Sequence, residues 1–384
     1  MDRPLKEMDE KEKALLVGFA TSPQDRWKEM DSLEELAQLT QTAGAEVFEK
    51  VMQIRPEPDP ATLIGRGKVQ EIRKIVEQFD LDMVIFNREL TPSQHRNLER
   101  EIGVKVIDRT ELILDIFAQH ARTAEAKIQV ELAQLEYRLS RLIGKGLELS
   151  RLGGGIGTRG PGEKKLEVDR RRIVDRIAFL KRKLKEIERT KALQRKRRKG
   201  LFKVTLVGYT NTGKSTLMNR LTKAHQLVED KLFATLDAVT RILYHPNRAI
   251  RIVLSDTVGF IEDLPPGLVA SFKATLSVVQ EANLLLHVID VSHPRLEDRI
   301  EVVERVLEEI GCEHLPRIQV FNKIDLLLEP EILDRLRDRY PEAVFVSAKT
   351  GEGLDVLTQK IYERAEAYFE QQPTRTPATE GSLG

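Results

Sequence analysis

The sequence predicts an α/β protein made of three folded parts. Apolar runs alternate with helical patterns near both ends of the chain. In the middle, apolar residues recur every three or four positions, and further on a glycine-rich phosphate-loop motif follows an apolar run. We therefore expect an N-terminal α/β domain with a mostly parallel sheet (1–122), an antiparallel coiled-coil hairpin (123–199), a P-loop α/β domain (200–367) and a disordered polar tail (368–384).

The composition is that of a globular protein without a disulfide framework. Hydrophobic residues make up 41% of the 384 residues and charged residues 32%, and Cys312 is the single cysteine. The 62 Lys and Arg nearly cancel the 61 Asp and Glu, so only the local charge informs about partners. The charged N-terminus lacks the apolar core of a signal peptide, and no stretch approaches the roughly 20 apolar residues of a membrane span. We expect a cytoplasmic protein.

The N-terminal domain is predicted from short apolar runs that alternate with helical patterns. Its first helix is expected to begin at Ser32, because Glu35 three residues later completes a capping box. Strands that alternate with helices favour a parallel sheet. The four expected strands are 14–19, 45–54, 83–86 and 104–107.

The middle of the chain carries two seams of apolar residues. In each seam the residues step by four, three, four and three positions, which is typical of helices that pack along one another. A glycine-rich connector separates the seams and predicts an antiparallel hairpin with this loop at its tip. The seams are Ile128, Leu132, Leu135, Leu139 and Leu142, and Ile173, Ile177, Leu180, Leu184 and Ile187.

The tip loop, GGGIGTRGPG at 153–162, contains the G-x-G-x-x-G spacing of a dinucleotide-binding turn. That function requires a preceding buried strand, whereas this loop follows a helix, so we reject it. An ordinary exposed linker is the alternative. From Lys164 to Lys199 the chain has 17 Lys and Arg against 5 Asp and Glu, and this excess favours contacts with RNA phosphates. The candidate RNA-binding residues are Gly155, Gly157, Arg159, Gly160, Lys164, Lys165, Arg170, Arg171 and Arg172.

The motif with the clearest chemistry lies in the C-terminal part. An apolar run (201–207) leads directly into GYTNTGKST, which matches G-x-x-x-x-G-K-[ST] and is followed by a helical pattern. Backbone N–H groups of such a loop hold phosphates at the helix N-terminus. Lys214 is expected to bridge the β- and γ-phosphates, and the Ser215 hydroxyl to ligate Mg²⁺.

Further motifs follow along the chain. Asp256 in DTVG is expected to hold the Mg²⁺ shell through water, and the N–H of Gly259 to sense the γ-phosphate. Asp325 in NKID can accept two hydrogen bonds from guanine, a donor pair that adenine lacks. The backbone of SAK (347–349) can meet the guanine O6. Thr235 suits the switch threonine that completes Mg²⁺ coordination, and its alternative is a plain loop threonine.

These motifs together predict a guanine-nucleotide site. His287 within an apolar run and Cys312 without a catalytic arrangement around it are expected to be structural. The candidate Mg²⁺ ligands are Ser215, Thr235 and, through water, Asp256. The candidate GTP-binding residues are Gly208, Tyr209, Thr210, Asn211, Thr212, Gly213, Lys214, Ser215, Thr216, Phe233, Thr235, Asp256, Gly259, Asn322, Lys323, Asp325, Ser347, Ala348 and Lys349.

The site residues resemble those of translation-associated GTPases, and the order of parts resembles one family among them, HflX. The resemblance covers about residues 14–365 and includes PATLIGRGK (60–68), the stretch 108–142 and the tip GGGIGTRGPGE. It implies a Ras-like GTPase domain in a protein that binds the large ribosomal subunit, with its rRNA and proteins, and splits stalled ribosomes under stress such as heat. The resemblance also links the N-terminal region to ATP, although no adenine site is recognisable there.

Two positions bear on hydrolysis. Phe260 stands where Ras-type enzymes carry the glutamine that orients the attacking water, so the catalytic side chain is unknown and isolated turnover is expected to be slow. The resemblance implies a hydrophobic residue at this position, and the ribosome or a rearranged switch must then complete the site. In several relatives an asparagine at the position of Asn211 helps to place K⁺, and the alternative is that Asn211 merely tolerates a turn.

Two other functions share the nucleotide motifs. One is a GTP-dependent assembly or checkpoint factor, which binds a precursor subunit and leaves on hydrolysis. The other is an RNA-binding adaptor in which the nucleotide domain serves only as a switch. A splitting factor would dissociate intact ribosomes into subunits, and this activity distinguishes it from both alternatives.

Overall fold

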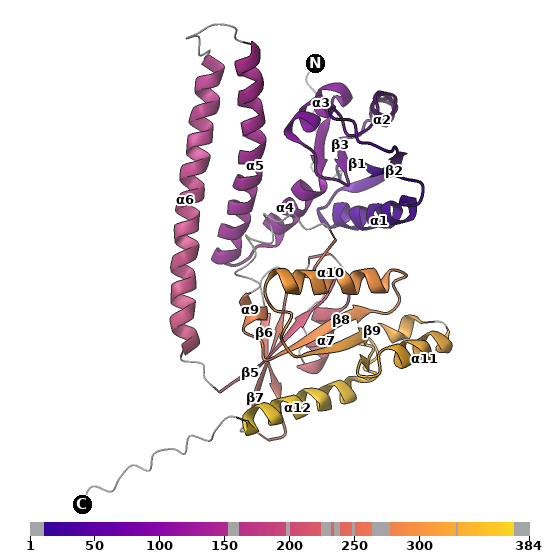
Figure 1. Ribbon diagram of the computed structural model, residues 1–384, viewed down its shortest axis with the longest axis vertical. Coiled ribbons are helices and arrows are strands. Elements are labelled where there is room, and N and C mark those ends of the chain that lie inside the picture. Colours follow the sequence, from indigo (N-terminus) through magenta and orange to yellow (C-terminus); the bar gives the residue numbers. More distant parts are fainter. Residues whose placement is uncertain are drawn as a thin grey trace, which may run out of the picture. The chain divides into compact units, whose positions relative to one another are not determined.

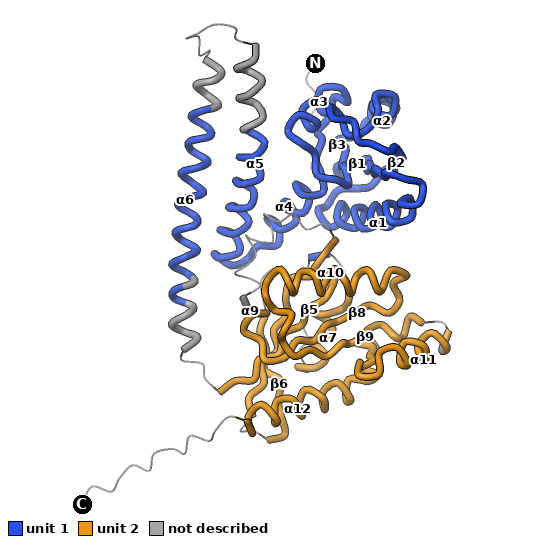
Figure 2. Tube along the Cα trace, in the orientation of Figure 1, with its two compact units in different colours: residues 1–191, 230–237, 263–273 blue, residues 192–229, 238–262, 274–384 orange. Residues whose placement is uncertain are grey.

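The computed structural model describes residues 11–152, 161–196, 200–223, 232–233, 239–247, 250–262, 277–327 and 329–371. The chain divides into two compact units, which Figure 2 distinguishes by colour. Unit 1 consists of residues 1–191, 230–237 and 263–273, and unit 2 of residues 192–229, 238–262 and 274–384.

Unit 1 contains a parallel sheet of four strands in the order β2-β1-β3-β4. Figure 1 labels β1, β2 and β3 of this sheet. Continuous apolar runs form its central strands, as is usual for a parallel sheet covered on both faces. The four predicted strands are confirmed to within one residue at their ends. They are β1 (Lys13–Ala20), β2 (Glu46–Ile54), β3 (Met83–Phe86) and β4 (Lys105–Asp108).

Four helices alternate with these strands. Ile72 and Leu98, from two different helices, pack with Val17 of β1 in one buried apolar cluster. The helices are α1 (Arg26–Thr42), α2 (Arg66–Phe79), α3 (Pro92–Ile102) and α4 (Arg109–His120).

The start of α1 differs from the prediction. The helix begins at Arg26, so Ser32 lies inside it and caps nothing. The Ser32 hydroxyl accepts hydrogen bonds from Asn87 Nδ2 at 2.9 Å and from Arg109 Nη1 at 3.3 Å. Glu35, the other half of the expected capping box, pairs with the same guanidinium. The sequence pattern of a cap is therefore part of a buried polar network.

Strand β2 forms an edge of the unit 1 sheet and carries an irregularity. Ala14 pairs with Val47, but Leu15 pairs with Glu49, so the register skips Phe48. Phe48 is therefore the extra residue of a β-bulge, which bends the edge strand and increases its twist.

The predicted helical hairpin is confirmed in unit 1 (Figure 1). Its helices are α5 (Ala124–Leu152) and α6 (Pro161–Lys196). An ion pair from Arg176 to Glu131 at 2.7 Å links the two helices beside the seam. The most deeply buried residues of the seam are Leu132, Ile177 and Leu180.

The fully buried carboxylate of Asp108 joins three segments of unit 1. As the N-cap of α4 it accepts a hydrogen bond from Glu111 N at 3.0 Å, and it accepts another from Leu90 N at 2.9 Å. From α5, Tyr137 Oη and Arg141 Nη2 each donate to it at 2.6 Å. Burial and the charge of Asp108 raise the pKa of Tyr137 above its usual value, so this hydroxyl remains a donor.

Unit 2 contains a mixed sheet in the order β10-β9-β8-β5-β7-β6, in which β6 runs antiparallel to β7 and the other pairings are parallel. The strands are β5 (Phe202–Val207), β6 (Val239–Tyr244), β7 (Arg251–Asp256), β8 (Leu284–Asp290), β9 (Arg317–Asn322) and β10 (Val344–Phe345). The α/β fold expected for this part is therefore confirmed.

The helices that lie within the described part of unit 2 are α7 (Lys214–Leu221), α9 (Ser277–Gln280), α10 (Leu296–Glu309), the 3₁₀ turn η1 (Ile324–Leu326), α11 (Pro330–Arg339) and α12 (Leu354–Glu370). Helix α12 continues past residue 367, where we expected the domain to end. Residues 372–384 of the predicted tail lie outside the described residues. Among the described helices, none has the length and apolar character to cross a membrane.

The parallel strands of unit 2 position the candidate site. The carboxyl ends of β5, β7 and β9 meet at one edge of the sheet, where ligands bind in open α/β folds. These ends lead into Gly208, Asp256 and Asn322. In β8, His287 is buried with Nδ1 3.5 Å from Glu304 Oε1, and burial lowers the pKa of His287.

Candidate functional site

The P-loop between β5 and α7 requires glycine at two positions. Gly208 has a φ of 155°, and a Cβ there would lie 2.3 Å from Val288 O. Gly213 has a φ of 86°, and a Cβ there would lie 2.4 Å from Asn322 Nδ2. Asn211 also has a positive φ, 57°, in the left-handed region that asparagine tolerates. Backbone conformation and close neighbours therefore explain this glycine pattern.

The Lys214 side chain folds onto the backbone of the P-loop. Its Nζ donates to Gly208 O at 3.1 Å and to Tyr209 O at 2.6 Å. Burial lowers the pKa of Lys214 to about 8, with Asp256 acting in the opposite direction and Lys323 in the same one. Phosphate oxygens would be stronger partners for this ammonium group than the two carbonyls are.

Nucleotide binding is expected to take up a proton at Lys214 in mildly alkaline solution. The free protein has a Lys214 pKa of about 8, and bound phosphates would raise it, so uptake should be about half a proton at pH 8 and close to none at pH 6.5. Titration calorimetry in two buffers with different ionisation enthalpies measures this uptake.

The Lys214→Arg variant is the control, because arginine stays protonated at these pH values and should show no uptake. The same depressed pKa predicts that the nucleotide-free protein gains stability between pH 8 and the unfolded-state value of 10.5, where the unfolded chain binds more protons. Equal uptake at pH 6.5 and pH 8 would contradict the assignment to Lys214.

Two of the predicted Mg²⁺ ligands lie together. Ser215 Oγ donates to Asp256 Oδ2 at 2.6 Å, and Asp256 is almost fully buried. A hydroxyl and a carboxylate suit Mg²⁺, which takes its other ligands from waters and substrate phosphates. No protein-only cage of His, Cys, Asp or Glu is found in the described part of the chain. Thr235, the third candidate, lies outside the described residues.

The structure brings the NKID and SAK motifs together. Asn322 Nδ2 donates to Thr212 O at 2.8 Å, and Asn322 Oδ1 accepts from Ala348 N at 2.9 Å. Ser347 Oγ donates to Asp325 Oδ1 at 2.6 Å. Asn322 is buried and ties the P-loop to the last loop, whereas Asp325 is exposed at the edge of the site. The exposed Asp325 carboxylate can therefore accept hydrogen bonds from a base that enters the site from solution.

The segment after Asp256 is hydrogen-bonded to the P-loop. Thr210 N donates to Phe260 O at 2.8 Å, and Phe260 N donates to Gly208 O at 3.1 Å. The Phe260 side chain is 1% exposed. A Cβ on Gly259 would lie 2.8 Å from Thr210 Cα and 3.0 Å from Lys214 Nζ, so the close approach depends on glycine.

Side-chain contacts link the P-loop and the segment after Asp256 to the start of α10, and the sequence did not predict them. Glu262 N donates to Tyr209 Oη at 2.8 Å, and the Arg299 guanidinium lies 4.4 Å from the centre of the Tyr209 ring. Arg295 Nη2 lies 3.3 Å from Glu262 Oε2. The only sequence feature that pointed to these contacts was the pair of arginines in HPRLEDR. The contacts were missed because they join residues that lie far apart in the chain.

A second missed contact holds the NKID loop. Lys323 has a φ of 68°, and its Nζ lies 2.7 Å from Asp290 Oδ2 at the end of β8. The sequence feature that could have revealed this contact is the aspartate at the end of β8, because β8 lies next to the strand that leads into NKID.

Phe233, a candidate GTP-binding residue, is buried against an aromatic ring of unit 1. Residues 230–237 belong to unit 1, although they follow the P-loop helix in sequence. The Phe233 ring meets Phe117 of α4 edge-on, with the ring centroids 4.7 Å apart, and Phe233 is 3% exposed. Burial of an aromatic ring against another is favourable, and it keeps Phe233 in the core of unit 1.

The candidate RNA-binding residues are only partly described. Arg170, Arg171 and Arg172 are exposed on α6. Lys164 and Lys165 lie in α6, but their side chains are outside the description, as are Gly155, Gly157, Arg159 and Gly160 altogether.

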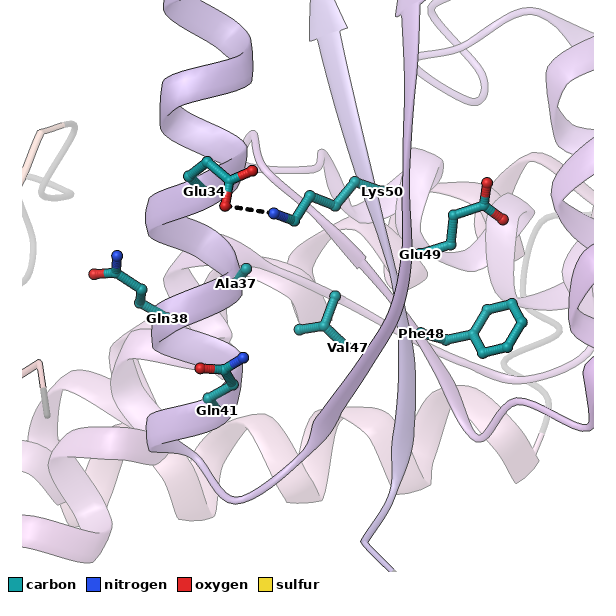
Figure 3. Close-up of a pocket in the computed structure, with 8 residues that line it drawn as sticks. All are labelled: Glu34, Ala37, Gln38, Gln41, Val47, Phe48, Glu49 and Lys50. Carbon is teal, nitrogen blue, oxygen red and sulfur yellow. Dashed lines mark ion pairs between the residues drawn. The ribbon is translucent and has the colours of Figure 1, made fainter.

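Unit 1 has a groove of about 510 Å³ between α1 and β2 (Figure 3). Its lysine, Lys50, points across the groove to Glu34, with Nζ 2.5 Å from Oε2. Two glutamates and one paired lysine give no surplus positive charge for a triphosphate, so this groove does not support the expected link to ATP. The lining residues are Glu34, Ala37, Gln38, Gln41, Val47, Phe48, Glu49 and Lys50.

Three family models match successive segments of the chain between residues 30 and 323. Residues 30–118 match the model described as GTP-binding GTPase N-terminal, residues 120–198 match GTP-binding GTPase Middle Region, and residues 203–323 match 50S ribosome-binding GTPase. These three models follow one another in the order of the parts expected from the sequence.

Relatives and a solved structure agree with these matches. A GTPase HflX of Caldanaerobacter subterraneus subsp. tengcongensis is 52% identical over 92% of this chain and 80% of its own length. A GTPase HflX of Escherichia coli K12 is 46% identical over 93% of this chain and 84% of its own length. The crystal structure of SsGBP in complex with GDP superposes with a TM-score of 0.51 at 28% identity, covering 94% of this chain and 99% of that one.

Proposed function

Because this chain belongs to the HflX family of GTPases, we propose that it binds the large ribosomal subunit and uses GTP binding and hydrolysis to split stalled ribosomes under stress. The family model over residues 203–323 is described as a 50S ribosome-binding GTPase, which supports the ribosomal partner. The relatives are named GTPases, and the assembled P-loop, DTVG, NKID and SAK motifs support hydrolysis of GTP as the reaction.

The nucleotide site carries this proposal. Lys214, Ser215 and Asp256 lie together at the carboxyl end of the sheet. Asn322 links the P-loop to the SAK loop, whose backbone would meet the guanine O6. When bound, Mg²⁺ would neutralise phosphate charge beside Ser215 and Asp256. A K⁺ ion beside the left-handed Asn211 is part of the same proposal.

The helical hairpin supports the ribosomal side. The glycine-rich residues 153–160 connect the end of α5 to the start of α6. On α6, Arg170 and Arg172 pair only loosely with carboxylates one turn away, at 3.6 and 3.8 Å. Such exposed pairs are weak, so phosphates of rRNA can replace them.

Turnover in isolation is proposed to be slow and to rise with ribosomes. Phe260 offers no hydrogen bond to water, and its side chain is buried. A group supplied by the ribosome or by a rearranged switch would then be needed for a fast reaction.

Sedimentation of intact ribosomes tests the proposal. Ribosomes incubated with the protein and a non-hydrolysable GTP analogue should separate into subunits. Binding only to immature subunits would support an assembly or checkpoint factor instead. Binding without any ribosome-stimulated hydrolysis would support an adaptor that uses nucleotide purely as a switch.

Replacing residues 153–162 by a short turn is expected to abolish splitting and to leave GTP affinity within about twofold. A nearly bare glycine loop on two helices can approach RNA closely, whereas the P-loop, DTVG, NKID and SAK motifs lie in unit 2. Nucleotide titration and subunit sedimentation on the same variant measure the two properties. Full splitting activity would reduce the loop to a linker, and lost GTP binding would revive its reading as a nucleotide loop.

A further inference from the structure

Thr210 is a buried polar residue whose hydroxyl forms no hydrogen bond with the part of the chain that the structure describes. The residue is 3% exposed, and its Oγ1 finds no hydrogen-bond partner among the described residues. Thr212, two positions later, donates to Tyr209 O at 3.1 Å. Buried hydroxyls are nearly always paired, so an unpaired one in a ligand-binding loop indicates a group that pairs with the ligand.

The neighbours of Thr210 place it at the phosphate end of the site. A Cβ on Gly259 would lie 2.9 Å from Thr210 Cγ2 and 3.0 Å from Lys214 Nζ. The backbone of Thr210 is also fixed, because its N–H donates to Phe260 O at 2.8 Å. Thr210 therefore adjoins both the lysine that would hold the terminal phosphates and the glycine that would sense the γ-phosphate.

The hydrolysis site lacks a water-orienting side chain at the usual position. Phe260 has no polar atom in its side chain, and it is buried. A hydroxyl supplies one donor and two acceptor lone pairs, so it can accept from water and donate to a phosphate oxygen at the same time.

We propose that the Thr210 hydroxyl acts directly in GTP hydrolysis, accepting a hydrogen bond from the attacking water and donating one to an oxygen of the γ-phosphoryl group. As the water oxygen bonds to phosphorus, the bond from phosphorus to the β–γ bridging oxygen breaks. Both protons of the water leave with the inorganic phosphate as H₂PO₄⁻, and Thr210 keeps its own proton. This role rests on the proposed hydrolysis at the P-loop site and adds a catalytic residue to it.

A pair of substitutions separates the hydroxyl from its packing. Thr210→Val keeps the shape and removes the hydroxyl, whereas Thr210→Ser keeps the hydroxyl and removes the methyl group. We expect single-turnover hydrolysis in the presence of ribosomes to fall between ten- and a thousandfold in Thr210→Val, as for loss of one transition-state hydrogen bond. Thr210→Ser should stay within about threefold of the natural protein, and fluorescent GTP and GDP analogues should bind both variants within about threefold of it.

The matched control is Thr358→Val, which removes a hydroxyl that donates to Leu354 O within α12 at 2.6 Å. Its hydrolysis rate should be unchanged, and thermal unfolding shows whether each variant is folded. A Thr210→Val rate within twofold of the natural protein overturns the proposal. So does an equal loss in Thr210→Ser, which would show a packing role, or a parallel loss of GTP affinity, which would show ground-state binding. If the natural protein itself hydrolyses no GTP, the proposed function fails first, independently of Thr210.

Discussion

Replacing Asp325 by asparagine is expected to weaken GTP binding by at least about a hundredfold and to strengthen the binding of xanthosine triphosphate. The carboxylate can accept from both the N1–H and the 2-amino group of guanine. An amide presents one donor in that place, which repels the guanine amino group and suits the 2-oxo group of xanthine. Two unsatisfied hydrogen bonds at roughly 1.4 kcal/mol each account for the hundredfold loss.

The structure makes this substitution clean. Asp325 is exposed. Among the described residues, its hydrogen bond is the one that it accepts from Ser347 Oγ at 2.6 Å, and an asparagine oxygen can also accept it. Asp334→Asn is the control, since Asp334 is an exposed carboxylate on α11 whose partner is Arg337 at 3.6 Å. Competition between GTP, xanthosine triphosphate and ATP for a fluorescent nucleotide measures the preference. An unchanged ratio in Asp325→Asn would refute the assignment of NKID as the base-reading motif.

Replacing Asp108 by alanine is expected to lower the free energy of unfolding of unit 1 by about 3–5 kcal/mol. The substitution removes four hydrogen bonds at once. It leaves Arg141, whose side chain is 16% exposed, with Tyr137 Oη as a hydrogen-bond partner and Glu111 at 3.6 Å as the nearest remaining carboxylate among the described residues. It also removes the N-cap of α4, a loss of about 1 kcal/mol by itself.

Urea unfolding followed by far-ultraviolet circular dichroism measures this loss. Asp169→Ala is the control, because Asp169 pairs with Arg172 on the surface of α6 at 3.8 Å, and such pairs contribute about 0–1 kcal/mol. Asp108→Asn should fall between the two, since an amide oxygen can still cap α4. Equal stability of Asp108→Ala and Asp169→Ala would show that the buried cluster contributes nothing net.

The fold was predictable where the signal is local. Every strand of unit 1 begins and ends within a residue of the expected bounds, because continuous apolar runs and helical periodicity are properties of short windows. The hairpin seam was equally clear, since Leu132 and Ile177 belong to stepped patterns that only a pair of helices explains.

The errors arise where distant residues decide the outcome. Ser32 and Glu35 have the spacing of a capping box. Both instead accept hydrogen bonds from Arg109, which lies more than seventy positions later in the chain. Phe233 follows the nucleotide loop in sequence, and its contact with Phe117 is one that no local pattern indicates, while its role at the nucleotide stays a prediction. The role of Asp108 could not be predicted for the same reason. Most of its hydrogen bonds come from segments that are distant in the chain, and no local sequence pattern indicates such contacts.

The bulge at Phe48 determines how the sheet of unit 1 ends. An edge strand exposes unpaired N–H and C=O groups, and a regular one is a template on which a second chain can add a strand. In β2 the extra residue interrupts the spacing of those groups, and Glu49 and Lys50 add charge next to the interruption. A second copy of β2 therefore meets no continuous ladder to extend, which protects a long exposed strand against aggregation through its edge.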